Sequence, residues 1–220
     1  MISRTKYSVN SNLISRALEE CKFDNFKTSL NKPTGSFFYD PWVLSEEFKG
    51  TVWEEILATL NVSSIGEARI IKLDIERCYT MHSDIDDRWH LALSEGMNFL
   101  VDLENQKFHS TNPGFWYIMD AGRLHSAVNF GDWPRYQLVI RKLLIPAVIE
   151  NSVSVNIKVQ GEHSRYKFDS TVSPWLNRAN KSNQLNSFEV KDNVVKFNTS
   201  IENVNELKKI IPEEFDTSYA

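Results

Sequence analysis

Cysteine is scarce in this chain of 220 residues, which contains only two. Cys21 and Cys78 lie far apart in the sequence and lack the close spacing of a metal-binding pair. So few cysteines exclude a scaffold held together by disulfides, and they are typical of a protein from a reducing compartment. We therefore expect a cytoplasmic protein.

Long apolar runs are lacking as well. No uninterrupted apolar stretch reaches the roughly 18 residues that indicate a membrane-spanning helix. The first residues, MISRTKYSVNSN, contain no apolar core of a secretory signal. We expect neither export by a standard signal nor a membrane anchor.

An excess of basic residues is the third absence. The chain has 25 Lys and Arg against 29 Asp and Glu, for a formal net charge of −4. Proteins that bind nucleic acid through a general basic surface have the opposite balance, so no nucleic-acid partner is expected. The apolar content of 41%, with six Trp and thirteen Phe, is enough to fill the core of one domain.

Helical spacing marks the first part of the chain, residues 1–66. The apolar residues of Leu13–Cys21 form one stripe just after a candidate cap, Ser11. A second helix is predicted to begin at Asp40-Pro41, because Asp caps free N–H groups and Pro fits the first turn. Gly50 can divide this helix, whose apolar residues recur every four positions: Leu44, Phe48, Val52, Ile56 and Leu60. We expect these residues to form a helical layer of the same domain.

The pattern changes at residue 67, and residues 67–150 are predicted to form short strands. Ile71, Leu73 and Ile75 alternate with polar residues, as expected for a strand. Three further alternating stretches, separated by turn residues, are Arg88–Leu93, Met97–Leu103 and Arg135–Leu144. This pattern is typical of an antiparallel sandwich or barrel covered by helices, a mainly β fold with flanking helices.

Residues 151–220 are more polar and are predicted to form an extension. Val153–Val159 alternates as a strand, and Phe188–Val190 with Val194–Phe197 indicates a hairpin. A short last helix is expected at 204–211, before Pro212. Residues 160–187 show weak periodicity, and we expect a long loop or lid there.

The chemistry is concentrated around three residues that suit a metal. His82 and Asp84 are separated by one residue, so on a strand their side chains point to the same face. His125, in a turn entering another predicted strand, supplies a third ligand. Two histidines and one carboxylate form the facial triad that leaves open positions on Fe(II). The same donors also hold Zn²⁺ or Mn²⁺.

Cationic residues follow the candidate ligands. Arg135 lies ten residues after His125, and an arginine can grip a carboxylate of a dicarboxylic co-substrate with two parallel N–H bonds. Arg88 and His90 share one face of a predicted strand, opposite Trp89, Leu91 and Leu93. Inward-facing polar groups of this kind need a bound anion or a partner. In the alternative interpretation, Arg88 pairs with Asp86 or Asp87 at the surface.

Four other residues are given ordinary structural interpretations. His109 lies near a predicted turn and is expected at the surface, whereas His163 lies in the stretch without clear periodicity and is given no role. Trp116 and Trp133 flank the segment of His125 and are expected to pack in the β core, although they could also line a pocket.

Two stretches, MHSDIDDRWHLAL and GFWYIMDAGRLHSAVNFGDWPRYQLVI, carry a family resemblance. Their H-x-D pair, R-x-H on the next strand, and distal H-x₃-N followed by Arg resemble the core of the aspartyl/asparaginyl β-hydroxylase-like oxygenases. That family includes enzymes similar to proline cis-4-hydroxylase. The resemblance covers about residues 71–144, a third of the chain.

The resemblance implies a double-stranded β-helix (a jelly-roll, cupin-like core) at residues 67–150. It implies Fe(II) bound by His82, Asp84 and His125, and 2-oxoglutarate bound by Arg135 with help from Arg88 and His90; Asn129 matches the Asn of the distal motif. The implied activity is hydroxylation by O₂ of an unactivated C–H bond in an amino acid, either free or within a peptide.

Two other classes of protein remain as alternatives. A cupin-like Zn²⁺ or Mn²⁺ enzyme, such as an isomerase, can use the same ligands without 2-oxoglutarate. A non-catalytic binding protein can also retain the barrel. The intact set of His, Asp and Arg residues favours the oxygenase.

Overall fold

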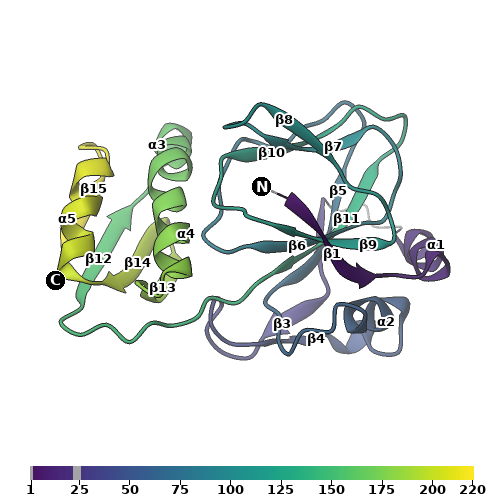
Figure 1. Ribbon diagram of the computed structural model, residues 1–220, viewed down its shortest axis with the longest axis horizontal. Coiled ribbons are helices and arrows are strands. Elements are labelled where there is room, and N and C mark those ends of the chain that lie inside the picture. Colours follow the sequence, from purple (N-terminus) through teal and green to yellow (C-terminus); the bar gives the residue numbers. More distant parts are fainter. Residues whose placement is uncertain (1, 22–25) are drawn as a thin grey trace.

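The computed structural model describes residues 2–21 and 26–220 (Figure 1). The fold is mixed α/β, and every strand pair in the described residues is antiparallel. The chain forms two parts that lie side by side, an N-terminal part of two facing sheets and a C-terminal part of one sheet with helices. Within the described residues, no helix has both the length and the apolar character needed to cross a membrane.

Six strands form the large sheet of the N-terminal part. Their order is β1 (Ile2–Ser8), β9 (Phe115–Met119), β6 (Arg88–Ala92), β11 (Arg135–Arg141), β5 (Ala68–Leu73) and β2 (Lys27–Ser29). The smaller sheet has the order β10 (His125–Asn129), β7 (Asn98–Asp102) and β8 (Lys107–Ser110). The free side of β10 pairs with residues 78–82 through two isolated bridges.

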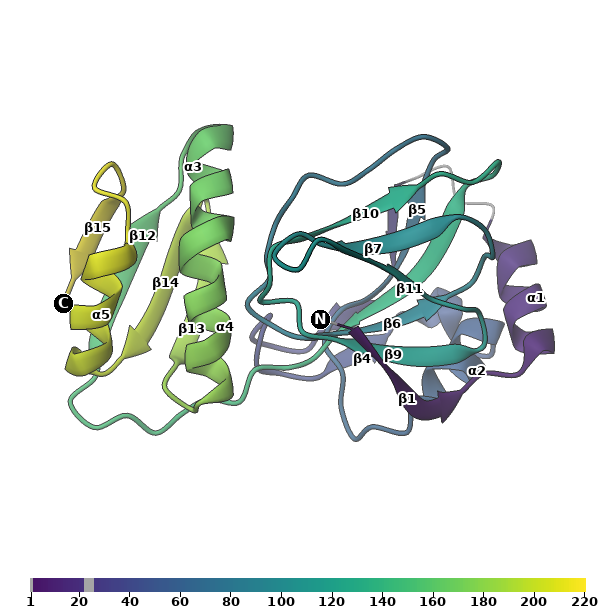
Figure 2. The ribbon, with the colours of Figure 1, turned by 45° about the horizontal axis from the view of Figure 1, so that its top comes forward.

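The chain passes repeatedly from one sheet to the other. From β5 it goes to residues 78–82 in the small sheet, back to β6, then to β7 and β8, back to β9, on to β10 and finally to β11. The two sheets face each other and enclose an interior (Figures 1 and 2). The alternating stretches predicted from the sequence as strands are therefore confirmed for β5, β6, β7 and β11, and the predicted strand at His125 is β10.

Two helices cover the outer face of the large sheet, α1 (Ser11–Glu20) and α2 (Val52–Ala58). Their buried residues pack with the sheet in one apolar cluster that includes Trp53 and Trp116. The predicted first helix is confirmed, although Asn10 provides the cap. Residues 1–66 contain more than the predicted helices, because β1 and β2 form both edges of the large sheet.

The predicted start of the second helix at Asp40-Pro41 is wrong. Residues Trp42–Leu44 form β4, which pairs with β3 (Asn31–Pro33), and a 3₁₀ turn, η1 (Glu46–Phe48), follows. The Asp40 carboxylate accepts from the N–H of Ser36, so it closes the preceding turn and does not cap a helix. Gly50 then takes a positive φ of 70°, and α2 begins after it with Thr51 as its cap.

The C-terminal part has a sheet of β13 (Asn186–Lys191), β14 (Val194–Thr199), β12 (Val153–Lys158) and β15 (Asp216–Tyr219). The predicted hairpin is confirmed, and Asp192 and Asn193 both have the positive φ that a tight hairpin turn requires. The predicted last helix is confirmed as α5 (Ile201–Ile210).

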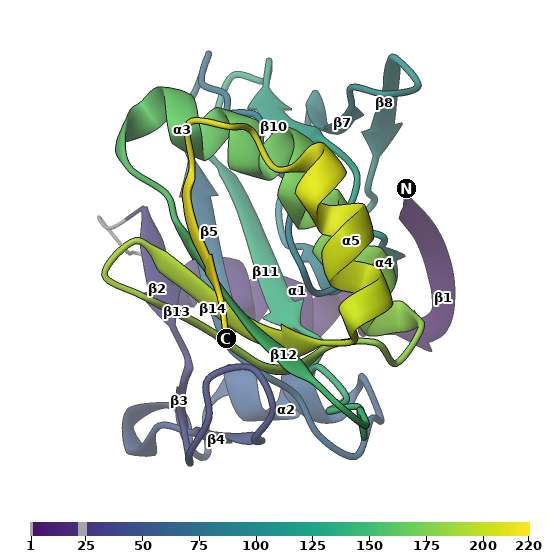
Figure 3. The ribbon, with the colours of Figure 1, turned by 90° about the vertical axis from the view of Figure 1, so that its left-hand side faces the viewer.

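The prediction of a long loop or lid at residues 160–187 is wrong. A continuous helical run fills most of it: α3 (Gly161–Lys167), the π-helical turn η2 (Phe168–Val172) and α4 (Ser173–Lys181). This run lies on the side of the C-terminal part that is next to the N-terminal part (Figures 1 and 2). Figure 3 shows the run and α5 on one face of the C-terminal sheet. Its buried apolar residues have helical spacing that the polar residues between them obscure: Phe168, Val172, Trp175, Leu176 and Ala179.

Glu67, just before β5, is a buried carboxylate that ties the edge strand β2 to the large sheet. Its oxygens form ion pairs of 2.6 Å with Lys27 and with Arg69, and Ser29 donates to it at 3.1 Å. Burial alone would raise the pKa of Glu67, but the two cations outweigh burial and lower it to about 2. The carboxylate is therefore more acidic in the folded protein than in the unfolded chain.

We expect Glu67→Gln to destabilise the protein near neutral pH by up to about 3 kcal/mol. Because the folded pKa is depressed, this stabilisation is complete above about pH 5 and disappears as the pH falls toward 2. Urea unfolding of both proteins across this pH range measures the difference. Glu55→Gln is the control, because its pair with Arg16 is exposed and should contribute little. A difference between wild type and Glu67→Gln that is independent of pH would contradict the expectation.

Candidate metal centre

His82, Asp84 and His125 converge at one end of the N-terminal part. One ligand atom from each lies within 4.8 Å of the others, and they are the one such group of three within the described residues. The Oδ2 atom of Asp84 is 3.8 Å from Nε2 of each histidine. His125 is buried, whereas the side chains of His82 and Asp84 are partly exposed. The site therefore has one face open to solvent and one face toward the interior.

The cross-strand pairing of His82 with His125 creates this arrangement. The N–H of His82 donates to the carbonyl of His125 at 3.0 Å, and the N–H of His125 donates back at 2.8 Å. Directly opposed residues of an antiparallel pair have side chains on the same face, and the two imidazole rings lie 4.4 Å apart. The N–H of Asp84 donates to the carbonyl of Ala121 at 2.7 Å, which holds the carboxylate beside both rings.

Backbone carbonyls orient both imidazoles. Nδ1 of His82 lies 2.8 Å from the carbonyl of Thr80, and Nδ1 of His125 lies 2.7 Å from the carbonyl of Arg123. A carbonyl only accepts hydrogen bonds, so each Nδ1 carries the hydrogen and each Nε2 presents a lone pair toward Asp84. This is the arrangement in which proteins prepare histidines for a metal.

The charge states also suit a cation. Burial lowers the pKa of His125 to about 4, so its ring is neutral at neutral pH. Burial acts to raise the pKa of Asp84, but Arg88 and the other positive groups around it together outweigh burial and hold the pKa well below its usual range. A neutral imidazole and an ionised carboxylate can bind a metal without first losing a proton.

A chain of buried charges positions the Asp84 carboxylate. Arg88 forms ion pairs of 2.7 Å with Oδ1 of Asp84 and 3.1 Å with Asp86. Asp86 in turn receives two hydrogen bonds from Arg141, at 2.6 and 3.0 Å. Arg88 thus occupies one oxygen of Asp84 and leaves the other facing the histidines. The alternative interpretation of Arg88 is confirmed for its partner Asp86 but wrong for the location, since both residues are buried and not at the surface.

The donor set fits a divalent metal, but it does not determine which one. Two imidazole nitrogens and one carboxylate oxygen suit Fe(II), Zn²⁺ or Mn²⁺. Three ligands from the protein leave coordination positions for other molecules, as in catalytic sites. We conclude that the triad can hold a metal ion.

A small cavity of about 50 Å³ extends from the triad into the interior between the two sheets. It contains the other three residues singled out in the sequence, Arg135, Arg88 and His90, all of them buried. Arg135 donates to the side chain of Gln137, and no carboxylate among the described residues forms an ion pair with it. Neither ring nitrogen of His90 has a hydrogen-bond partner in the described part of the chain. Burial lowers the pKa of both Arg135 and His90, and Arg135 lowers that of His90 further.

Sequence reasoning missed four polar residues of this cavity, namely Tyr79, Gln137, Arg69 and Ser126, the residue after His125. Gln137 lies two positions after Arg135 on β11, so strand alternation could have found it. Arg69 lies two positions before Ile71 on β5, on the same face. Tyr79 lies in a segment without regular alternation, and no signal in the sequence points to it.

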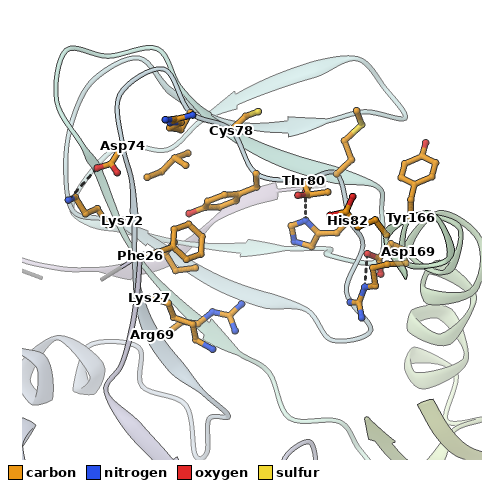
Figure 4. A pocket seen from close by; sticks show the side chains of 17 residues that line it. Phe26, Lys27, Arg69, Lys72, Asp74, Cys78, Thr80, His82, Tyr166 and Asp169 are labelled. Carbon is orange, nitrogen blue, oxygen red and sulfur yellow. Dashed lines mark hydrogen bonds and ion pairs between the residues drawn. The ribbon is translucent and has the colours of Figure 1, made fainter. Parts of the chain in front are cut away.

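A larger pocket of about 960 Å³ opens beside His82 (Figure 4). It shares His82, Tyr79 and Arg69 with the small cavity. One wall is formed by β5 and the segment that follows it, residues 74–82. The other wall is formed by the C-terminal helical run. In Figure 4, Tyr166 and Asp169 of this run lie next to His82, far from Lys72 and Asp74.

The helical run also clamps the segment that carries the ligands. Ser83 donates its hydroxyl to the carbonyl of Asp169, and Ser173 donates to the carbonyl of Ser83 at 3.1 Å. The Asn177 amide donates to the carbonyls of Asp84 and Ile85 at 3.2 and 3.0 Å. Residues 151–220, for which the sequence revealed no chemistry, therefore hold the backbone of the H-x-D segment in place.

The remaining residues named from the sequence lie outside the cavities. His163 is exposed on α3, and His109 is half-buried in strand β8, not in a turn. Trp116 packs in the apolar core as expected, whereas Trp133 is exposed, contrary to the expectation. Asn129 is buried, and its amide donates to the carbonyls of Leu73, Asp74 and Trp133, which fastens β10 to the segments beside it.

We expect Asn177→Ala to weaken metal binding about 10- to 100-fold, because the carbonyls of Asp84 and Ile85 lose their hydrogen-bond donor. Competition with a chelator for Zn²⁺ measures the affinity, and His82→Ala provides the reference for loss of a ligand. Asn156→Ala, on β12 of the same C-terminal part, is the matched control. Wild-type metal affinity in a folded Asn177→Ala protein would show that the clamp does not position the site.

Comparison with known proteins adds no assignment. The sequence matches no protein-family model and no curated protein. The function must therefore be argued from the triad and the two cavities next to it.

Proposed function

We propose that this protein is an Fe(II)- and 2-oxoglutarate-dependent dioxygenase that hydroxylates an unactivated C–H bond. The observation that carries the proposal is Arg135, a buried guanidinium without a carboxylate partner among the described residues, in the cavity that also contains the triad. A buried charge without a counter-ion is costly, so such an arginine is expected to receive an anion. The distal carboxylate of a 2-oxo acid that chelates the metal is an anion suited to this position.

The connection of the strands supports the proposal. The chain alternates between the sheet β9-β6-β11-β5 and the sheet formed by residues 78–82 with β10-β7-β8. Alternation of this kind is characteristic of jelly rolls and cupins. We therefore propose a double-stranded β-helix core at residues 67–150, covered by residues 1–66 and extended by residues 151–220.

The residues have separate tasks in this proposal. His82, Asp84 and His125 would hold Fe(II), with Arg88 keeping the second oxygen of Asp84 occupied. When bound, the iron supplies oxidation by O₂: one oxygen atom enters the substrate C–H bond and the other enters succinate, formed from 2-oxoglutarate with release of CO₂.

Arg135 would bind the distal carboxylate of 2-oxoglutarate with charge-assisted N–H bonds. The buried Nη1 of Arg88 and the ring nitrogens of His90 have no partner in the described residues, so Nη1 and the N–H of the neutral imidazole remain as donors to the co-substrate. The buried residues that line the cavity would limit the access of bulk water to the co-substrate. An arrangement of this kind provides binding and orientation from the protein and leaves the oxidation to the metal.

The proposed substrate is a small molecule or a peptide, with an amino acid side chain as the target. This part of the proposal rests on the family resemblance of residues 71–144. The pocket of about 960 Å³ beside His82 is large enough for either kind of substrate. No nucleic-acid partner is proposed.

Titration of the Fe(II)-loaded protein with 2-oxoglutarate in the absence of O₂ tests the function. We expect the weak visible charge-transfer band of a 2-oxo acid chelate. Arg135→Gln should raise the half-saturating concentration of 2-oxoglutarate about 10- to 100-fold, since it removes a charged hydrogen-bond donor but no metal ligand. Arg178→Gln, at an exposed arginine on α4, is the control and should titrate like the wild type.

The other outcomes point to the alternatives. Bound iron without a band would favour a cupin-like Zn²⁺ or Mn²⁺ enzyme that does not use 2-oxoglutarate. Failure to bind any metal would favour a non-catalytic binding protein. An unchanged titration of Arg135→Gln would remove the observation on which the proposal rests.

A further inference from the structure

Asp169, on the π-helical turn η2, carries a buried carboxylate at the wall of the large pocket. The residue is 3% exposed, and its Oδ1 atom has no hydrogen-bond partner in the described part of the chain. It lines the same pocket as His82, and Figure 4 shows the two side chains next to each other. A buried carboxylate oxygen without a hydrogen-bond donor destabilises the fold unless a ligand supplies the donor.

The metal triad does not account for this carboxylate. The ligand atoms that converge on one point belong to His82, Asp84 and His125, and Asp169 is not among them. Asp169 is also far in sequence from the family resemblance, on a segment for which no chemistry was predicted. It is a group near the metal centre that the proposed reaction leaves without a task.

The position of Asp169 is fixed relative to the metal ligands. The hydroxyl of Ser83 donates to the main-chain carbonyl of Asp169, and Ser83 lies between His82 and Asp84 in the sequence. The hydroxyl of Ser173 then donates to the carbonyl of Ser83. A molecule bound by the Asp169 side chain would therefore be held at a defined place beside the metal ligands.

Only Arg165 forms an ion pair with Asp169 in the described residues, from Nε to Oδ2 at 3.0 Å. The Arg165 side chain is 59% exposed, so water can hydrate its guanidinium once it moves away from the buried carboxylate. Arg165 also lines a neighbouring pocket of about 350 Å³ between the two parts of the molecule. Its guanidinium can therefore leave Asp169 for the space beside it when another cation takes over the pairing.

We propose that Asp169 binds a positively charged amino group of the substrate, which takes the place of Arg165. This inference rests on the proposed function and deepens it, because it gives the C-terminal part the task of selecting cationic substrates. Glu162 and Tyr166 lie on the same wall of the pocket and favour a cation through negative charge and an aromatic face. The wall formed by the N-terminal part has a net positive charge, because Lys72 and Arg77 outnumber Asp74. The C-terminal wall has a net negative charge, because Glu162 and Asp169 outnumber Arg165.

The competing arrangement is that Arg165 binds an anionic group of the substrate and Asp169 only holds the arginine. The two arrangements make opposite predictions for the removal of Arg165. If Arg165 competes with the substrate cation, its loss should strengthen binding. If Arg165 is itself the receptor, its loss should weaken binding of an anion.

Binding of n-butylammonium to the Zn²⁺-loaded full chain tests the proposal, with butyrate as the anionic probe of the same length. Chemical-shift titration by NMR gives the affinity and reports whether the shifts lie around the H-x-D segment and η2. We expect Asp169→Asn to weaken n-butylammonium binding about tenfold or more. Arg165→Gln should strengthen it about two- to fivefold, and butyrate should not bind at this pocket.

Equal n-butylammonium affinity of wild type and Asp169→Asn would overturn the proposal. Weaker n-butylammonium binding by Arg165→Gln would also overturn the proposal. The same holds if butyrate binds to the wild type and this binding is lost in Arg165→Gln. If Asp169→Asn does not fold, the direction of the Arg165→Gln effect decides alone. The probe needs neither iron nor 2-oxoglutarate, so a failure here with a normal 2-oxoglutarate band removes only this inference. Amine binding without that band would instead remove the oxygenase and retain the cation site.

Discussion

The site depends on the ion pair between Arg88 and Asp84. A carboxylate next to two imidazoles in a largely buried position is stable only if another charge compensates it, and Arg88 does so at 2.7 Å. Asp86 and Arg141 then balance Arg88 from behind. Arg141 contacts the rings of Phe37 and Phe38. One line of alternating charges thus runs from Asp84 to the junction with the C-terminal part, and removal of any member would leave the other buried charges out of balance.

The two parts of the molecule contribute different things to this centre. The N-terminal sheets bring the ligands together, because the pairing of His82 with His125 places two residues that are 43 positions apart on one face. The helical run of the C-terminal part holds the carbonyls of residues 83–85 by side-chain hydrogen bonds. Phe38, Ile85 and Leu144 also belong to the C-terminal apolar core. The C-terminal part is therefore a structural support of the site.

The sequence predicts those features that depend on local alternation. His82 with Asp84, Arg88 with His90, and the strands that carry them follow the two-residue period of a strand. Features that depend on single side-chain contacts across the chain were missed. Asp40 closes the turn before it instead of capping a helix after it, and nothing local distinguishes the two outcomes. The helical run at 161–181 packs on two sides, so its polar residues, such as Asn177 and Asp169, are buried and conceal its apolar stripe.

The buried groups that lack a full set of partners differ between the inner and the outer side of the site. Most buried charges are compensated within the protein, as Glu67 and Asp86 are. Among the described residues, the exceptions next to the triad are of two kinds. In the interior cavity, Arg135 has no carboxylate partner and His90 has no hydrogen-bond partner; on the wall of the outer pocket, Oδ1 of Asp169 has no donor, although Oδ2 pairs with Arg165. A buried polar group without a partner destabilises the fold. Such groups are therefore expected where a ligand supplies the missing partner. An anion in the inner cavity and a cation in the outer pocket would satisfy these groups on the two sides of His82, which lines both cavities.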